Sequence, residues 1–229
     1  MSRFFIFDAV HTILRPVPDV MSTYFLAGQK FGSQFSKDEV KQRFRKARRR
    51  HFGTDTPAEQ TQPGSLPSSD DDEYQLWKEL VTDLFADVRP IDSMFKGLWE
   101  HFASPKSWQL FDDVEVCWQR LRQSGGRLVI ASNFDSRLHE IVAQQSAIAE
   151  ADAVFCSAEV GYRKPDPKFY EFVSKSLGLT ETDEVTMVGD DFENDYAAPR
   201  KFGWQAYHLD RRHGVELSKH MISSLSQLS

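Results

Sequence analysis

The stretch FFIFDAVHTIL, residues 4–14, sets the expectation for the whole chain. Its first four residues, 4–7, are apolar and have the length and composition of a buried strand, and Asp8 follows where that strand would end. Thr12 stands four residues further on. An aspartate after a strand is commonly a turn residue or a helix cap, so Asp8 alone says little about function. Its meaning depends on whether other strands end in a similar way.

Four more apolar runs have the character of buried strands. They are RLVIAS (127–132), AVFCS (153–157), VTMVG (185–189) and WQAYHL (204–209). Helical periodicities separate these runs, and such an alternation is typical of parallel strands joined by helices. The sequence therefore predicts an α/β fold, with a doubly wound, Rossmann-like parallel sheet.

The alternation is interrupted after the first strand. From Pro18 to about Phe102 the periodicity is helical and no run looks like a strand. This predicts a helical cap inserted between the first and second strands of the sheet. We place the cap at residues 17–103 and the α/β core at residues 1–16 and 104–229.

Two stretches of the predicted cap are unusual in composition. Basic residues dominate 41–50, while Val40, Phe44, Ala47 and His51 fall on one face of the predicted helix. We interpret the basic residues as the solvated face of this helix. The alternative is a basic wall that attracts anions.

The segment 53–72 is rich in Pro, Gly, Ser and Asp, and we interpret it either as a lid or as a loop without fixed structure. Its last residues suit a helix start, with Ser69 as the cap and acids in the first turn.

Composition excludes several classes of function. The chain has 229 residues and a net charge of −6, which argues against a nucleic-acid-binding protein and favours a small-molecule substrate. No apolar run approaches the ~18 residues that span a bilayer. The strand pattern begins within three residues of the first residue, so we expect no signal peptide, no membrane partner and a cytoplasmic location. The sequence gives no indication of an oligomeric state.

The chain has two cysteines, Cys117 and Cys156, and both lie in apolar stretches. They are neither closely spaced nor numerous, which argues against a disulfide framework and against a zinc site. We interpret them as buried thiols.

Polar groups follow the predicted strands in a consistent order. Asp8 follows the first strand, Ser132 and Asn133 end the second, GYRKPDP (161–167) with Lys164 follows the third, and GDDFEND (189–195) ends the fourth. In a parallel sheet the ligand site forms beyond the carboxyl ends of the strands. Each motif alone is a common loop sequence, but four in this order predict one shared site.

These strand-end motifs resemble those of the haloacid dehalogenase superfamily of hydrolases. The resemblance covers almost the whole chain, and the helical insert is similar to the first type of cap in that superfamily. From WQLFDDV (108–114) through SNFD, KPDP and GDDFENDYAAPRKFG to the closing ISSLSQL, the chain especially resembles the branch of rhythmically expressed, haloacid-dehalogenase-like hydrolase domain proteins.

The resemblance implies a role for each strand-end residue. Asp8 matches the nucleophile that forms an aspartyl intermediate, and Lys164 matches the lysine that neutralises charge on the nucleophile and on the phosphoryl oxygens. Ser132 matches the hydroxyl that binds the transferring phosphoryl group, and Asn133 helps hold that loop. Thr12 is assigned to the same phosphate-binding set.

The resemblance also implies a Mg²⁺ site. Its ligands would be Asp8, Asp190, Asp195 and the backbone carbonyl of Val10. Oxygen ligands of this kind suit Mg²⁺, and without a cation the acids, with Asp191 among them, would crowd negative charge and raise one another's pKa. A carboxylate that attacks a phosphate dianion needs gathered cations, and Lys164 with Mg²⁺ would supply them.

Val10 departs from the family pattern. In most phosphatases of the superfamily the residue two after the nucleophile is a second aspartate, which protonates the leaving group. Valine cannot do this, and general acid–base help is worth about 10²–10⁴ in rate. We therefore expect a Mg²⁺-dependent phosphatase that acts on a small phosphorylated substrate and is weak on alkyl phosphomonoesters.

Several alternatives remain open for a chain with Val10. The substrate could carry a good leaving group, such as an acyl or aryl phosphate, or His11 could act as the acid if the backbone twists after the strand. Catalysis could be reduced, which would leave a protein that binds a phosphate ligand or a partner. A metal-independent 2-haloacid dehalogenase would also tolerate valine, but the acids of GDDFEND would repel a haloacid carboxylate.

Overall fold

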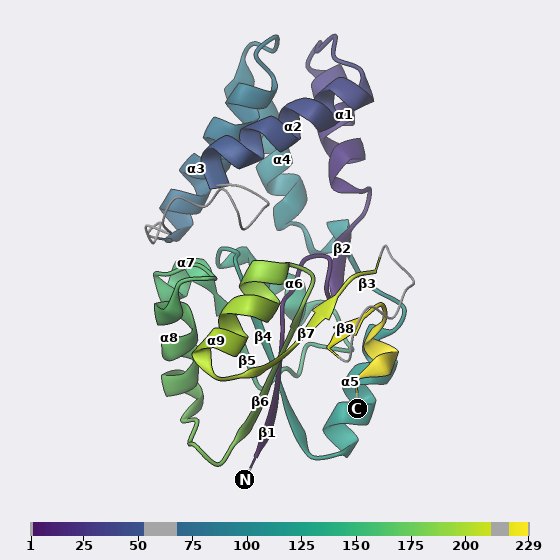
Figure 1. The fold of residues 1–229 in the computed structure, drawn as a ribbon. Coiled ribbons are helices and arrows are strands. Elements are labelled where there is room, and N and C mark those ends of the chain that lie inside the picture. Colours follow the sequence, from purple (N-terminus) through teal and green to yellow (C-terminus); the bar gives the residue numbers. More distant parts are fainter. Residues whose placement is uncertain (1, 53–67, 212–219, 229) are drawn as a thin grey trace.

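The computed structural model describes residues 2–52, 68–211 and 220–228. It has an α/β part around one sheet, and four helices that extend from one end of that part (Figure 1). Of the predicted loop at 53–72, residues 53–67 lie outside the described residues. In the described ranges, no helix combines the length and the apolar character that a membrane span requires.

A six-stranded parallel sheet forms the core, with strand order β5-β4-β1-β6-β7-β8. The strands are β1 Arg3–Phe7, β4 Gly126–Ser132, β5 Ala153–Cys156, β6 Glu184–Gly189, β7 Gln205–Leu209 and β8 Met221–Ile222. The predicted doubly wound α/β fold is confirmed, and each of the five predicted runs contains a strand. The boundaries differ by a residue: Ser157, predicted to end the third run, begins a helix instead.

Apolar residues on both faces of β1 bind the sheet to two layers of helices. Phe5 and Phe7 belong to one hydrophobic cluster and Phe4 and Ile6 to another, because successive side chains of a strand point to opposite faces. The first cluster includes residues of α5 (Val114–Gln123) and α6 (Arg137–Ala143), and the second includes residues of α8 (Pro167–Leu177). A strand buried on both faces explains the unbroken apolar run at 4–7.

The shorter elements complete this part of the chain. They are α7 Ser157–Val160, α9 Ala198–Phe202, the 3₁₀ turns Pro105–Ser107 and Leu225–Gln227, and the π-helix Phe192–Ala197. The sequence did not predict β8 of the main sheet, nor β2 Leu14–Pro16 and β3 Trp108–Leu110, which pair antiparallel where the chain leaves and re-enters the core. Two or three residues are too few to give a recognisable strand period.

The described residues of the inserted part form four helices, and the helical character agrees with the sequence pattern. They are α1 Val20–Lys30, α2 Lys37–Phe52, α3 Asp70–Leu84 and α4 Ile91–Ala103. Their apolar residues form a third hydrophobic cluster of their own. The exact division into a cap at 17–103 and a core at 1–16 and 104–229 stays a prediction.

Helix α3 begins as its sequence indicates. The Ser69 hydroxyl accepts the backbone N–H of Asp72 at 3.1 Å, and four acids occupy the first turn. The helix ends at Leu84, and Val88 packs into the same hydrophobic cluster from the turn that follows.

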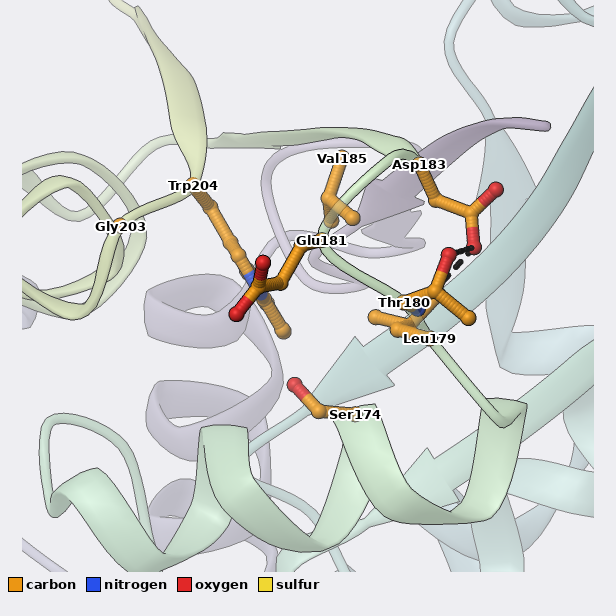
Figure 2. Close-up of a pocket in the computed structure, with 8 residues that line it drawn as sticks. All are labelled: Ser174, Leu179, Thr180, Glu181, Asp183, Val185, Gly203 and Trp204. Atoms are coloured by element: carbon orange, nitrogen blue, oxygen red, sulfur yellow. Dashed lines mark hydrogen bonds between the residues drawn. The ribbon is translucent and has the colours of Figure 1, made fainter. Parts of the chain in front are cut away.

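A cleft of about 260 Å³ opens at the end of the sheet where the strands begin (Figure 2). Trp204, just before β7, and Val185, near the start of β6, form part of its wall. The predicted site residues follow the other ends of the strands, so this cleft is separate from them.

Two glycines in the inserted helices should respond oppositely to alanine. A methyl group on Gly28 would overlap the buried ring of Phe85, whereas one on Gly97 meets open space. Gly97→Ala should raise the free energy of unfolding by about 0.5–1 kcal/mol through helix propensity. Gly28→Ala should lower it by about 1–3 kcal/mol through overpacking. Urea denaturation of both variants checks this, and equal effects would contradict the packing of α1 on Phe85.

Candidate active site

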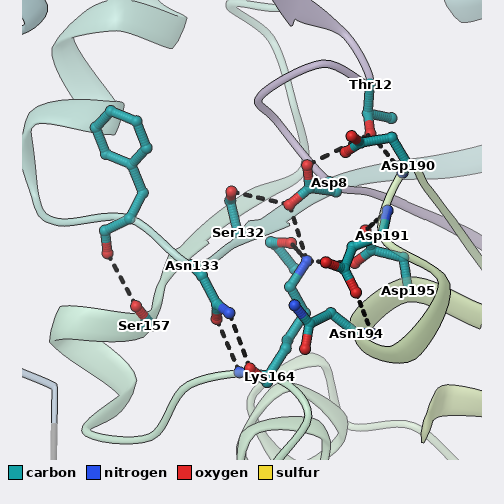
Figure 3. A network of polar contacts seen from close by, with 12 residues as sticks. Asp8, Thr12, Ser132, Asn133, Ser157, Lys164, Asp190, Asp191, Asn194 and Asp195 are labelled. Carbon is teal, nitrogen blue, oxygen red and sulfur yellow. Dashed lines mark hydrogen bonds and ion pairs between the residues drawn. The ribbon is translucent and has the colours of Figure 1, made fainter. Parts of the chain in front are cut away.

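The carboxylate of Asp8 lies at the centre of the predicted site. Its backbone N–H continues the pairing of β1 with β6 by donating to the Val188 carbonyl at 2.9 Å. One carboxylate oxygen, Oδ1, accepts both the Ser132 hydroxyl and the Lys164 ammonium, each at 2.9 Å (Figure 3). The other, Oδ2, has only a long contact of 3.4 Å with the Thr12 hydroxyl. Asp8 is therefore fixed through one oxygen while the other is weakly engaged.

Lys164 joins two carboxylates in the interior. Its Nζ donates to Asp8 at 2.9 Å, to Asp195 at 2.6 Å and to the Ala131 carbonyl at 2.9 Å, so all three N–H donors are used. Burial alone would lower the pKa of Lys164, but the charges of Asp195 and Asp8 outweigh it and raise that pKa. The ammonium group therefore stays charged.

Asn133 fixes the backbone of Lys164 from a neighbouring loop. Its side-chain N–H donates to the Lys164 carbonyl and its side-chain oxygen accepts the Lys164 N–H, both at 2.8 Å. This pair of bonds ties the loop after β4 to the loop after β5. The predicted role of Asn133 as a residue that holds its loop agrees with these contacts.

Asp8, Asp190 and Asp195 bring carboxylate oxygens within 4.8 Å of one another. Burial and the charges of Asp8 and Asp195 raise the pKa of Asp190 well above its ordinary value. Burial also raises the pKa of Asp195 to about 7, although Lys164 acts to lower it. Three acids beside one ammonium leave excess negative charge, as the sequence predicted, and this all-oxygen donor set fits a hard divalent cation such as Mg²⁺.

The acids of the GDDFEND loop have different surroundings. Asp195 is buried, with one oxygen on Lys164 and the other accepting the Asp191 N–H at 3.1 Å. Asp191 caps the π-helix by accepting the N–H groups of Glu193 and Asn194. Asp190 has only Thr12 as a side-chain partner among the described residues. Asp190 is thus the most available of these carboxylates for a ligand.

Thr12 lies between two acids rather than beside an open space. Its Oγ1 is 3.4 Å from oxygens of both Asp8 and Asp190 and accepts the Asp190 N–H at 3.1 Å. A hydroxyl has one proton, so it can donate to only one carboxylate at a time. The sequence assigned Thr12 to phosphate; the contacts observed are to the carboxylates.

Two residues near the end of β7 support the site and were not singled out from the sequence. The Arg211 guanidinium donates to the Thr12 carbonyl at 2.8 Å and pairs with both oxygens of Asp113 at 2.9 Å. An imidazole nitrogen of His208 lies 3.1 Å from the Asp190 carbonyl. Neither belongs to a strand-end motif, so only proximity in the fold could reveal them.

Val10 and His11 lie in the turn after Asp8. The Val10 side chain packs against the hydrophobic cluster around Phe7. His11 has φ +66°, in the left-handed region that few non-glycine residues adopt, and its side chain is exposed. The backbone therefore turns at His11, and its role as an acid stays a prediction. The metal contact predicted for the Val10 carbonyl stays a prediction.

Both loops that position Lys164 and Ser132 also contact the inserted helices. Arg137 pairs with Asp135, donates to the Trp99 carbonyl at 3.0 Å and stacks 3.3 Å from the centre of the Trp99 ring. Arg163, next to Lys164, forms an ion pair with Glu73 of α3. Glu73 is buried, although the helix pattern gave no sign of it.

Comparison with known proteins identifies relatives along the whole chain. A model of the haloacid dehalogenase-like hydrolase family matches residues 3–203. Haloacid dehalogenase-like hydrolase domain-containing protein 3 of Danio rerio is 25% identical over 99% of this chain and 94% of its own length. The Rhythmically expressed gene 2 protein of Drosophila melanogaster is 23% identical over 97% of this chain and 92% of its own length.

Solved structures share the fold at low identity. A dehalogenase with an intermediate complex superposes with a TM-score of 0.71 at 20% identity, covering 98% of this chain and 94% of the other. A HAD phosphatase from Thermococcus onnurineus has a TM-score of 0.63 at 22% identity, covering 99% and 95%.

Gly189 should tolerate no side chain because of Asp195. A Cβ at position 189 would overlap the Asp195 side chain, which is buried and cannot move aside. Gly189→Ala should lower the free energy of unfolding by about 1–3 kcal/mol. In an Asp195→Gly background the same change should cost much less, because the overlapping atoms are absent. A double-mutant cycle by urea denaturation measures this, and additive effects would contradict the packing.

Proposed function

Because the chain belongs to the haloacid dehalogenase-like hydrolases, we propose that it hydrolyses a small phosphorylated substrate through an aspartyl-phosphate on Asp8. Its fold and relatives confirm the family resemblance expected from the strand-end motifs. The observation that carries the proposal is the arrangement of Asp8, Asp190 and Asp195, whose oxygens lie within 4.8 Å of one another, while the buried Lys164 ammonium group donates to Asp8 and to Asp195.

The weakly engaged Oδ2 of Asp8 is suited to attack phosphorus. Lys164 and Ser132 hold Oδ1 and so orient the carboxylate. In the first step a bond forms from an Asp8 oxygen to phosphorus, and the bond to the leaving group breaks with its electron pair. In the second step the oxygen of water bonds to phosphorus, the bond from phosphorus to Asp8 breaks with its electron pair returning to the carboxylate, and a proton from the water passes to solvent. Lys164 stabilises the negative charge in both steps.

The same carboxylates would hold Mg²⁺ as the cofactor. We assign Asp190 and Asp8 as the main metal ligands. Asp195 is assigned a lesser part, because both of its oxygens already accept hydrogen bonds, and the Val10 carbonyl is an additional ligand. When bound, the cation would offset the charge of the acids and of the phosphoryl group. We further propose a cytoplasmic location and neither nucleic acid nor membrane as a partner.

Val10 restricts the leaving group. Its side chain packs with apolar residues, so the position taken by an acid in most phosphatases of the family holds hydrocarbon. An acyl or aryl phosphate leaves without protonation, whereas a sugar alkoxide needs a proton. The proposed substrate therefore carries a good leaving group, with His11 as the alternative source of a proton.

Dehalogenation is the second candidate, and Val10 is the observation that favours it. Halide leaves without a proton, and one solved neighbour is a dehalogenase while another is a HAD phosphatase. We prefer phosphoryl transfer because the intact acids beside Asp8 would repel a haloacid carboxylate. A protein that only binds its ligand would keep the same acids and show no turnover.

Phosphate release from acetyl phosphate, p-nitrophenyl phosphate and a sugar phosphate tests the proposal. With Mg²⁺ the native protein should hydrolyse the first two, and Asp8→Asn should abolish this activity. Val10→Asp should raise the rate on the sugar phosphate by about 10²–10⁴ if it restores a general acid. Turnover of chloroacetate in EDTA would instead establish the dehalogenase, and Mg²⁺ binding without any turnover would establish the binding protein.

Mg²⁺ binding should weaken as pH falls through about 7. The metal requires ionised carboxylates, and because the pKa of Asp195 is raised to about 7 and that of Asp190 is also raised, protons compete with the metal as the pH falls. For each proton displaced, the Kd should be about tenfold weaker at pH 6 than at pH 8. Calorimetric titration at the two pH values, with Asp190→Asn as a control that should remove most binding, measures this. An unchanged Kd would contradict binding at these acids.

A further inference from the structure

A second group of ligand side chains lies at the edge of the sheet. His139 of α6, Cys156 at the end of β5 and Glu159 of α7 each offer one ligand atom, and these three atoms lie within 4.8 Å of one another. Strand β5 is two places from β1 in the sheet, so the group is separated from Asp8 by ~10 Å of strand spacing. It belongs to none of the strand-end motifs used above.

The three side chains differ in how freely they can move. Cys156 is fully buried, which fixes its sulfur in place. The side chains of His139 and Glu159 are 44% and 48% exposed, and an imidazole nitrogen lies 2.8 Å from a carboxylate oxygen. The group therefore has one fixed inner ligand and two adjustable outer ligands, which leaves a route for an ion from solvent.

The surroundings of Cys156 carry negative charge. Glu159, Asp135 and Asp70 act on the thiol, although Asp135 also pairs with Arg137. A divalent ion bound to the sulfur would offset this charge.

We propose that His139, Cys156 and Glu159 form a zinc site. Thiolate and imidazole ligands select Zn²⁺ over the hard cation proposed for the Asp8 acids. Three protein ligands with a water in the fourth position satisfy the tetrahedral preference of zinc. On binding, the Cys156 thiol loses one proton to solvent, its sulfur and a neutral His139 nitrogen each donate an electron pair, and Glu159 binds as the carboxylate.

The adjustment that zinc requires is small. Bond lengths of about 2.0–2.3 Å place tetrahedral ligand atoms ~3.3–3.6 Å apart. The His139 and Glu159 atoms would separate from 2.8 Å, and both would approach the sulfur from within 4.8 Å. Rotation of two exposed side chains provides both movements without a change in the buried cysteine.

The proposed zinc site departs from the expectation drawn from cysteine spacing. The sequence argued against zinc because Cys117 and Cys156 are far apart. In the proposed site only Cys156 is a cysteine, and a histidine and a glutamate supply the other two ligands. Cys117 is the matched contrast: it is also buried, but its side-chain partner is the Arg120 guanidinium, a cation that disfavours a metal.

Cobalt and zinc titrations of the metal-stripped full chain test the site. Co²⁺ should give thiolate-to-metal charge-transfer absorption in the native protein, in Cys117→Ser and in Asp190→Asn, but not in Cys156→Ser. His139→Ala and Glu159→Gln change exposed side chains that the fold does not need. Each should weaken Zn²⁺ binding by roughly tenfold or more in calorimetry, since tetrahedral sites depend on each ligand.

Two results would overturn the zinc site. One is the absence of charge-transfer absorption when Co²⁺ is in excess over native protein. The other is Zn²⁺ binding that survives both His139→Ala and Glu159→Gln and is lost in Asp190→Asn, which would place the ion at the Asp8 acids. Because the readouts are absorption and binding, they are independent of whether the proposed hydrolysis occurs.

Discussion

Lys164 places a buried ammonium group between two buried carboxylates, and the geometry of the candidate site depends on this arrangement. An isolated charge in the interior is costly, and losing one partner of a buried pair typically costs about 3–5 kcal/mol. The ammonium group and the two carboxylates therefore stabilise one another's positions. Since Asp8 follows β1 and Asp195 lies in the loop after β6, one side chain connects the ends of neighbouring strands.

The loops around this ammonium are also attached to the inserted helices. Arg163 precedes Lys164 and pairs with Glu73, while Arg137 follows the Ser132 loop and stacks on Trp99. A shift of the helices would therefore be felt by the residues that orient Asp8. This attachment gives the insert a physical route to influence the site.

Val10 lies two residues after Asp8, and its side chain packs with apolar residues. Hydrocarbon therefore occupies this position, and the proposed restriction on the leaving group rests on that packing. At one edge of the sheet, His139 and Glu159 lie close to the buried thiol of Cys156, and these three residues are the zinc site that we propose.

The sequence by itself determined the α/β class, the five main strands, the helical insert and the strand-end residues, because burial on both faces and ligand sites at strand ends leave local patterns. It missed β2, β3 and β8, which are too short to show a period, and it did not show that Glu73 would be buried against Arg163. The phosphate-binding role that it assigned to Thr12 stays a prediction, and the structure adds the contacts of Thr12 with Asp8 and Asp190. Only the tertiary structure decided the contacts of Arg211, His208 and the group around Cys156. These contacts join residues that are far apart in the chain, and residues of these types occur throughout the sequence, so no local pattern marks them.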